Sequence, residues 1–224
     1  MKNDRLDVDR TRSDLLQAIL PHVPFDGWSA PAFDAAVRDA GLDAGLARVI
    51  CPRGAVDLAV AYHRSGDHGM ESALAATDLG GLRFRDRVAM ALRLRLEAAD
   101  PELVRRGAAL FALPQHALTG ARLIWETADA VWRALGDSSE DYNWYTKRAT
   151  LSAVYSATVL FWLADESEGH ADTWAFLDRR IADVMQFEKI KGKLPGLASA
   201  LGGIRAPSAA RDLPGSVLNT GGRV

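Results

Sequence analysis

The chain has 224 residues, of which 48% are apolar and 25% charged, with a formal net charge of −2 at pH 7. This length allows one large domain or two small ones, and the composition excludes a fibrous or disordered protein. A nearly neutral chain has no general attraction to polyanions. The single cysteine, Cys51, excludes an internal disulfide and a thiolate metal cluster, and its neighbours Val49 and Ile50 predict a buried, unreactive thiol.

No stretch alternates as a strand would, whereas helix start and stop signals recur at intervals of about 12 to 25 residues, so the sequence predicts an all-α fold. The helices expected first are one ending near Pro21, one from a Ser29 cap to Gly41 after a loop over 24–28, a short one over 44–50, and one that Pro52 opens and Gly66 or Gly69 closes. These short helices, with a glycine in the turn, have the outline of a helix-turn-helix unit.

The charge of this unit argues against DNA binding. Residues 29–69 contain four arginines and five aspartates, so this unit cannot neutralise the phosphates of DNA. The segment 44–50 offers only Arg48 for contact with a base. We therefore expect no nucleic-acid partner, although a ligand-sensing repressor remains the alternative function.

Longer helices are predicted over residues 82–98, 101–113 behind an Asp100 cap, 114–135, and from Asp172 onward. Residues 149–164 contain no charged residue and no histidine. At ~1.5 Å per residue they span ~24 Å, short of the ~30 Å hydrocarbon core of a bilayer. We expect this segment to be a helix buried on all sides.

Catalytic signatures are absent from the sequence. It has no Gly-x-Ser-x-Gly elbow, no glycine-rich phosphate loop and no His-Glu-x-x-His motif, and His63 and His68 are not spaced to share a helical face. We expect a protein that is not an enzyme and has no metal or cofactor. Apolar stripes on the long helices predict a lipid cavity between the last three of them, although core packing explains the stripes equally well. The residues expected to line this cavity are Leu92, Leu96, Phe111, Leu118, Trp125, Trp132, Tyr155, Trp162 and Trp174.

Two further segments predict contacts with other molecules. Adjacent aromatic residues beside basic ones, Trp144 and Tyr145 next to Lys147 and Arg148, are typical of a protein-binding surface when they are exposed. In residues 188–205, apolar side chains recur every three or four positions among basic ones, which is typical of a helix lying on an anionic membrane. The residues expected to touch the membrane are Ile190, Lys191, Lys193, Leu194, Leu197 and Leu201.

The C-terminal segment has an alternative that is equally open, namely docking on its own domain or on a second subunit. The domain prediction is a helix-turn-helix-like unit over 1–69, a helical ligand domain over 70–190, and an amphipathic segment with a mobile tail over 191–224. The first seven residues lack both the apolar core of a signal peptide and the composition of a transit peptide. We expect a bacterial-type cytoplasmic protein that associates peripherally with the inner membrane.

Several motifs resemble one family. The run Asp-Tyr-Asn-Trp-Tyr-Thr-Lys-Arg-Ala at 141–149, with 165–167 and 172–180, resembles the ninth Coq protein family, lipid-binding accessory proteins of ubiquinone biosynthesis. Residues 51–58 resemble a second marker of that family, in which the first position is more often Phe than Cys. The resemblance extends roughly over residues 10–190.

The resemblance implies a Tet-repressor-like fold with a degenerate helix-turn-helix unit. Arg48 stands where a DNA-contacting Tyr is usual in such regulators, and Gly54 where a phosphate-contacting Lys is usual. The family implies a homodimer that binds an isoprenoid quinone intermediate or phospholipid and presents the quinone to the di-iron demethoxyubiquinone hydroxylase through Trp144 and Tyr145. A ligand-responsive Tet-repressor-like regulator is the alternative.

Overall fold

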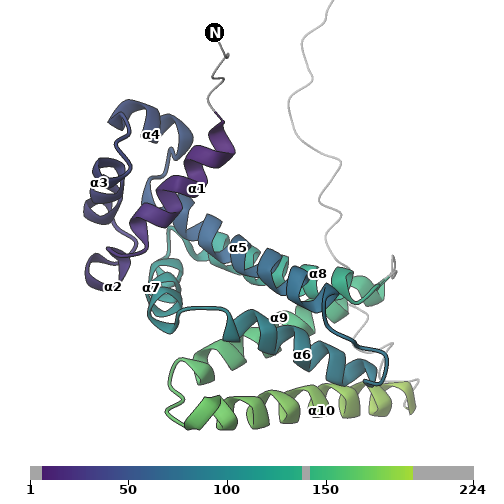
Figure 1. Cartoon of the computed structure of the whole chain (residues 1–224). Helices are drawn as coiled ribbons and strands as arrows, with labels where there is room; N and C mark the ends of the chain where they lie inside the picture. Colours follow the sequence, from purple (N-terminus) through teal and green to yellow (C-terminus); the bar gives the residue numbers. More distant parts are fainter. Residues whose placement is uncertain (1–6, 138–141, 194–224) are drawn as a thin grey trace, which may run out of the picture. The chain divides into compact units, whose positions relative to one another are not determined.

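The computed structural model describes residues 7–137 and 142–193, which are helical apart from turns and contain no strand in those ranges (Figure 1). The helices are α1 (Val8–Ile19), α2 (Val23–Asp26), α3 (Ala30–Asp39), α4 (Ala44–Ile50), α5 (Ala55–Ala75), α6 (Phe84–Glu97), α7 (Pro101–Ala112), α8 (Ala117–Ala134), α9 (Tyr142–Trp162), the 3₁₀ turn η1 (Glu168–His170) and α10 (Ala171–Lys193). The all-α prediction is confirmed. Contacts divide the chain into two units, 1–184 and 185–224, and of the second the structure describes only the end of α10.

Side-chain caps mark the starts of α1, α3, α4 and α7. The Ser29 hydroxyl accepts a hydrogen bond from the backbone N–H of Ala32, and the Asp100 carboxylate accepts from those of Glu102 and Leu103. Such caps satisfy backbone donors that have no partner inside the helix. The predicted caps of α3 and α7 are therefore confirmed.

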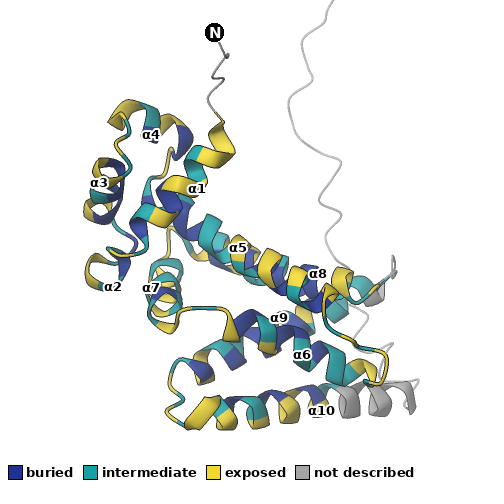
Figure 2. Ribbon diagram, in the orientation of Figure 1, coloured by how far each residue is buried: buried dark blue, intermediate teal, exposed yellow. Residues whose placement is uncertain are grey.

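The first four helices pack with the start of α5 around one apolar cluster, which Figure 2 shows as buried faces turned toward one another. Its buried side chains include Leu15, Ile19, Phe33, Ile50 and Leu58. Cys51 is fully buried in this cluster, as predicted.

The short helix α2 lies where a loop was predicted. Pro24 fits its first turn because a backbone N–H, which proline lacks, would have no partner inside the helix there. Gly27, at φ +68°, closes the helix by donating its N–H to the carbonyl of Val23. The expectation of a plain loop over 24–28 was wrong, since Pro24 and Gly27 stand at the two ends of one helical turn.

Helix α5 is longer than the sequence predicted. It begins at Ala55, behind Gly54 at φ +59°, and passes through Gly66 and Gly69 to Ala75, so the predicted end at either glycine was wrong. In a helix, each glycine is about 1 kcal/mol less favourable than an alanine. The packing of α5 against α6 and α8 outweighs this cost. The predicted domain boundary at residue 69 falls inside this helix.

A second apolar cluster joins the far end of α5 to α6, α8, α9 and α10. Helix α9 belongs to this cluster but is not buried on all sides, because Leu160 is 67% exposed and Phe161 37% exposed. The ring of Phe161 stacks on that of Phe176 in α10, with 4.7 Å between centroids. The prediction of a helix in residues 149–164 is confirmed. The prediction that this helix is buried on all sides was wrong, because an uncharged face can also lie at the surface.

One carboxylate joins the end of α9 to the start of α10. Asp165 accepts hydrogen bonds from the backbone N–H groups of Ser167 at 2.8 Å and Thr173 at 2.9 Å. Hydrogen bonds from the side chains of Ser167 and Thr173, and then these backbone bonds, lower the pKa of Asp165 below its ordinary value of 3.8. Because the folded-state pKa is lowered, the stabilisation is complete above pH 3.8 and is lost as the pH falls below that value.

We expect Asp165→Asn to lower the free energy of unfolding at pH 7, since the amide keeps the shape of the side chain but not its charge. The difference from the unmodified protein should shrink as the pH falls from about 4 toward 2, because the carboxylate of the unfolded chain takes up a proton before that of the folded protein. Urea denaturation at a series of pH values measures this. Asp178→Asn, at an exposed position of α10, is the control, and an equal effect of both substitutions would contradict the role of Asp165.

Candidate functional site: an apolar cavity with a polar floor

A cavity of about 390 Å³ lies between α5, α7, α8 and α9, with Trp28 at one side. This volume is within the roughly 300 to 1,000 Å³ typical of small-molecule sites. Most of its wall is apolar, and the larger apolar side chains are Leu103, Val104, Phe111, Leu123, Ile124 and Val159. The cavity suits an apolar ligand.

The mouth of the cavity is formed by small side chains. Ala108 and Ala112 of α7 and Ala117 and Ala121 of α8 line the cavity and are exposed, as is Leu160 of α9. Alanine side chains leave space between helices where larger ones would meet. These exposed lining residues mark where the cavity meets the surface.

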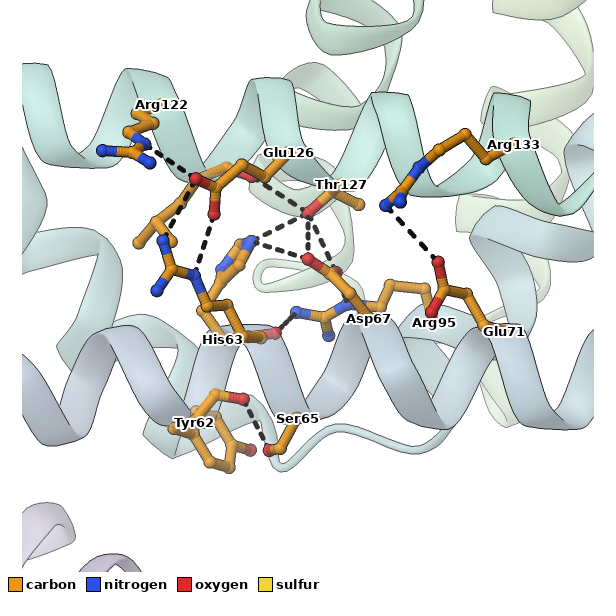
Figure 3. A network of polar contacts seen from close by, with 12 residues as sticks. Tyr62, His63, Ser65, Asp67, Glu71, Arg95, Arg122, Glu126, Thr127 and Arg133 are labelled. Carbon is orange, nitrogen blue, oxygen red and sulfur yellow. Dashed lines mark hydrogen bonds and ion pairs between the residues drawn. The ribbon is translucent and has the colours of Figure 1, made fainter. Parts of the chain in front are cut away.

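The polar residues of the lining are called here the polar floor: Tyr62, His63, Arg95, Tyr155 and Ser156. Arg95 is only 4% exposed. Its Nε donates to Oδ1 of Asp67 at 2.7 Å, and its Nη2 donates to the carbonyl of His63 at 2.9 Å. Figure 3 shows the guanidinium between these two residues of α5. A buried cation thus borders an otherwise apolar cavity.

Three helices meet at Asp67. Its carboxylate accepts from Arg95 of α6 and from the hydroxyl of Thr127 of α8, at 2.9 Å. The ring Nε2 of His63 lies 2.8 Å from the same hydroxyl oxygen (Figure 3). The same hydroxyl is also placed to donate to the carbonyl of Leu123 in its own helix, at 3.2 Å.

His63 is uncharged at neutral pH. Burial, and then the positive charge of Arg95, lower its pKa from 6.5 to about 4. Burial also raises the pKa of Tyr62 and of Tyr155, so both hydroxyls stay protonated. The charges of Arg95 and Asp67 cancel, and the polar floor carries no net charge.

Gly66 makes room for the Arg95 guanidinium. A Cβ at Gly66 would lie 2.5 Å from both Cζ and Nη1 of Arg95, closer than atoms can approach without displacement. The guanidinium could move away only by lengthening its bonds to Asp67 and His63. The glycine that looked like a helix end in the sequence is a packing requirement.

The cavity does not lie where the sequence predicted it. It was expected between the last three long helices, whereas no residue of α10 is among its lining. Of the nine expected lining residues, Phe111 and Tyr155 line it. The other seven do not line it, and they are Leu92, Leu96, Leu118, Trp125, Trp132, Trp162 and Trp174.

Those seven residues have other surroundings. Leu92, Leu96 and Trp162 are buried in the second apolar cluster, while Leu118 is 88% exposed. The remaining three lie in aromatic or cation contacts: Trp125 with Trp144, Trp132 stacked on Phe84, and Trp174 below Arg93. Small residues such as Gly107, Ala108 and Gly120 line the cavity instead, and they give no hydrophobic stripe that a sequence could reveal.

The aromatic segment at the start of α9 is partly exposed. Tyr145 is 62% exposed, and its ring lies 4.8 Å from that of Trp144, which in turn lies 5.8 Å from that of Trp125. Lys147 donates to Asp137 at 2.7 Å. Trp125, Trp144 and Tyr145 are called the aromatic patch below.

Arg148 does not belong to that surface. It is 1% exposed, its Nε donates to Asp129 at 2.5 Å, and its guanidinium lies 4.0 Å from the ring centre of Trp144. The expectation of an exposed, partner-binding Arg148 was wrong. Arg148 is close to the exposed Tyr145 in sequence. It follows Trp144 by one helical turn, however, and its guanidinium lies beneath the Trp144 ring.

The predicted membrane contacts cannot be placed at side-chain level. Leu194, Leu197 and Leu201 lie outside the described residues, and for Ile190, Lys191 and Lys193 only the helical backbone is described. Among the described helices, none is both long and apolar enough to cross a membrane. Within the same ranges, no three His, Cys, Asp or Glu side chains converge as a metal site would require.

Comparisons with known proteins bear on the family. A family model described as COQ9 matches residues 117–188. The chain is 32% identical over 198 residues to the mitochondrial ubiquinone biosynthesis protein COQ9 of Drosophila melanogaster, with 85% of this chain and 60% of that protein covered. The Rattus norvegicus protein of that name is 30% identical over 195 residues, with 84% and 62% covered. The resemblance to the COQ9 family is confirmed.

The comparison with COQ9 extends to the human protein, which is 29% identical over 195 residues, covering 84% of this chain and 61% of the relative. The chain thus spans about three fifths of the length of these COQ9 proteins. All three are named as mitochondrial, which contradicts the expected bacterial-type cytoplasmic location. That expectation rested on seven terminal residues, whose composition alone does not decide targeting.

A solved structure supports the fold. The TetR transcriptional regulator from Nitrosomonas europaea aligns with a TM-score of 0.63 and 19% identity, over 78% of this chain and 97% of that one. The predicted Tet-repressor-like fold is confirmed. In this chain Arg48 of α4 lies 3.5 Å from Asp34, an ion pair within the helix-turn-helix-like unit.

We expect Gly66→Ala to destabilise the protein by roughly 1 to 3 kcal/mol, because the added methyl group displaces the buried Arg95 guanidinium. Gly69→Ala in the same helix is the matched control. It is exposed with nothing near the added Cβ, so alanine should stabilise by up to about 1 kcal/mol through helix propensity. Urea denaturation measures both, and stabilisation by both substitutions would contradict the close approach of Arg95.

Proposed function

We propose that this protein is a non-enzymatic lipid-binding accessory protein of ubiquinone biosynthesis, which holds an isoprenoid quinone intermediate in the cavity between α5, α7, α8 and α9. The names of its COQ9 relatives support the pathway. The observation that carries the proposal is an apolar cavity whose mouth is built from exposed alanines. A quinone moving from a bilayer into such a cavity exchanges one apolar medium for another, so the transfer costs little free energy.

The proposed role requires binding and release rather than bond chemistry. The titratable groups at the polar floor are in forms suited to hydrogen bonding: a neutral His63 and an Arg95 balanced by Asp67. None of these is an activated nucleophile of the kind covalent catalysis requires. We therefore propose that the chain presents its ligand to a partner enzyme, the di-iron demethoxyubiquinone hydroxylase, and works as a homodimer near a membrane surface.

We propose that the aromatic patch contacts the hydroxylase. Tyr145 offers a large exposed ring, and rings of this kind dominate binding energy at protein interfaces. Trp144 and Trp125 lie beside it and widen the apolar surface. Arg148, buried below Trp144 and paired with Asp129, holds that ring in place before a partner arrives.

We expect Ala108→Trp to reduce the lipid that copurifies with the protein severalfold, because the indole would fill the mouth of the cavity. Ala109→Trp is the matched control, since Ala109 is exposed on the same helix but is not part of the lining. Mass spectrometry of organic extracts from protein purified without detergent, beside denatured controls, measures the isoprenoid quinone and phospholipid content. Equal lipid content in both variants, or clean extracts from the unmodified protein, would contradict the proposed cavity.

We expect Tyr145→Ala to weaken binding to the purified hydroxylase by roughly 30-fold, the effect of losing an aromatic hot spot worth about 2 kcal/mol. Lipid content and the urea midpoint should not change, because the ring is mostly exposed. Phe25→Ala, at an 84% exposed aromatic on α2, is the control and should leave binding unchanged. Biolayer interferometry gives the affinities, and unaltered affinity for the Tyr145 variant would exclude the aromatic patch as the contact.

A further inference from the structure

Arg95 keeps hydrogen-bonding capacity that the protein does not use. An arginine carries five N–H groups. Among the described residues, Arg95 donates from Nε to Asp67 and from one N–H of Nη2 to the His63 carbonyl. The side chain is almost fully removed from solvent and lines the cavity. The remaining N–H groups are therefore donors at the edge of an apolar space.

This arrangement lowers the stability of the folded protein. Burying an ion pair often stabilises a protein less than apolar side chains of the same volume would. The pair also requires a glycine in the middle of α5, since any Cβ at Gly66 would overlap the Arg95 guanidinium. Buried charges and unfavourable local residues that meet at a cavity are typical of ligand recognition.

We propose that Arg95 is a specificity-determining residue of the cavity, whose guanidinium donates a hydrogen bond to an uncharged ring oxygen, a quinone carbonyl or phenol oxygen, on an otherwise apolar ligand. This inference rests on the proposed function and deepens it. A hydrogen bond to Arg95 would place the ring of the ligand at the polar floor, near Tyr155 and His63, and its tail toward the alanine mouth.

Charge favours a neutral head group over a phosphate. The positive charge of Arg95 is already balanced by Asp67 at 2.7 Å, and His63 is neutral because its pKa is lowered to about 4. Tyr62 and Tyr155 supply no charge either. A phosphate would bring an uncompensated negative charge into a nearly dry site, whereas a ring carbonyl needs only a donor. Phosphate heads are therefore disfavoured.

Three probes that share a decyl tail and differ in head group test the proposal: decylubiquinone, decylbenzene and decyl phosphate. Their affinities for the full chain are measured at equilibrium with cyclodextrin-solubilised probe, and each is corrected for the partition of that probe into hydrocarbon. The unmodified protein should bind decylubiquinone most tightly. The variant Asp67→Leu/Arg95→Met removes both charges together and so leaves no unpaired charge buried.

In that double variant the affinity for decylubiquinone should fall about 10- to 100-fold, the loss of a hydrogen bond from a charged donor, while decylbenzene binds within about twofold as before. A merely structural role of Arg95 would weaken both probes alike and would overturn the inference. Tightest binding of decyl phosphate by the unmodified protein would overturn it as well, in favour of a phospholipid head.

The unmodified protein alone keeps the inference testable if the double variant does not fold. Corrected affinities that are equal for decylubiquinone and decylbenzene would refute head-group recognition and leave lipid binding in place. Failure of the unmodified protein to bind either probe would instead refute the proposed function, and the inference with it. The two failures are therefore distinguishable.

Discussion

The buried carboxylate of Asp67 is the contact on which the arrangement of the helices around the cavity depends. It accepts from Arg95 of α6 and from Thr127 of α8 while belonging to α5, so one side chain sets the spacing of three helices. A charge buried without its partner costs about 3 to 5 kcal/mol, which means that these helices cannot separate independently of one another. The cavity keeps its shape because the network behind its floor is closed.

The mouth and the floor of the cavity follow opposite physical rules. At the mouth, alanines of α7 and α8 leave space, and nothing polar competes for an apolar ligand. At the floor, the charge of Arg95 is balanced by Asp67 behind it, and His63 contacts Thr127. An apolar tail with a single polar ring matches both ends, and this match is the physical basis for proposing a quinone rather than a hydrocarbon or a charged lipid as the ligand.

The aromatic patch depends on a similar combination of surface and support. Tyr145 is exposed, but the adjacent Trp144 lies over the buried Arg148, which is tied to Asp129 and Asp137. A basic residue that looked in the sequence like part of the contact surface is its internal support. Sequence proximity could not separate these two roles, because neighbouring residues of a helix point in different directions.

The sequence by itself determined the helices, because their causes are local. Ser29 and Asp100 cap α3 and α7 through hydrogen bonds to residues two or three positions away, and apolar periodicity marks the buried faces of α1 and α3. The motifs in the sequence predicted the resemblance to the COQ9 family and the Tet-repressor-like fold. What only the tertiary structure decided is where helices leave space. Gly66 leaves room for Arg95, and Ala108 of α7 lines the same cavity as Ala121 of α8. These residues are distant in sequence, and their small side chains leave no periodic signal.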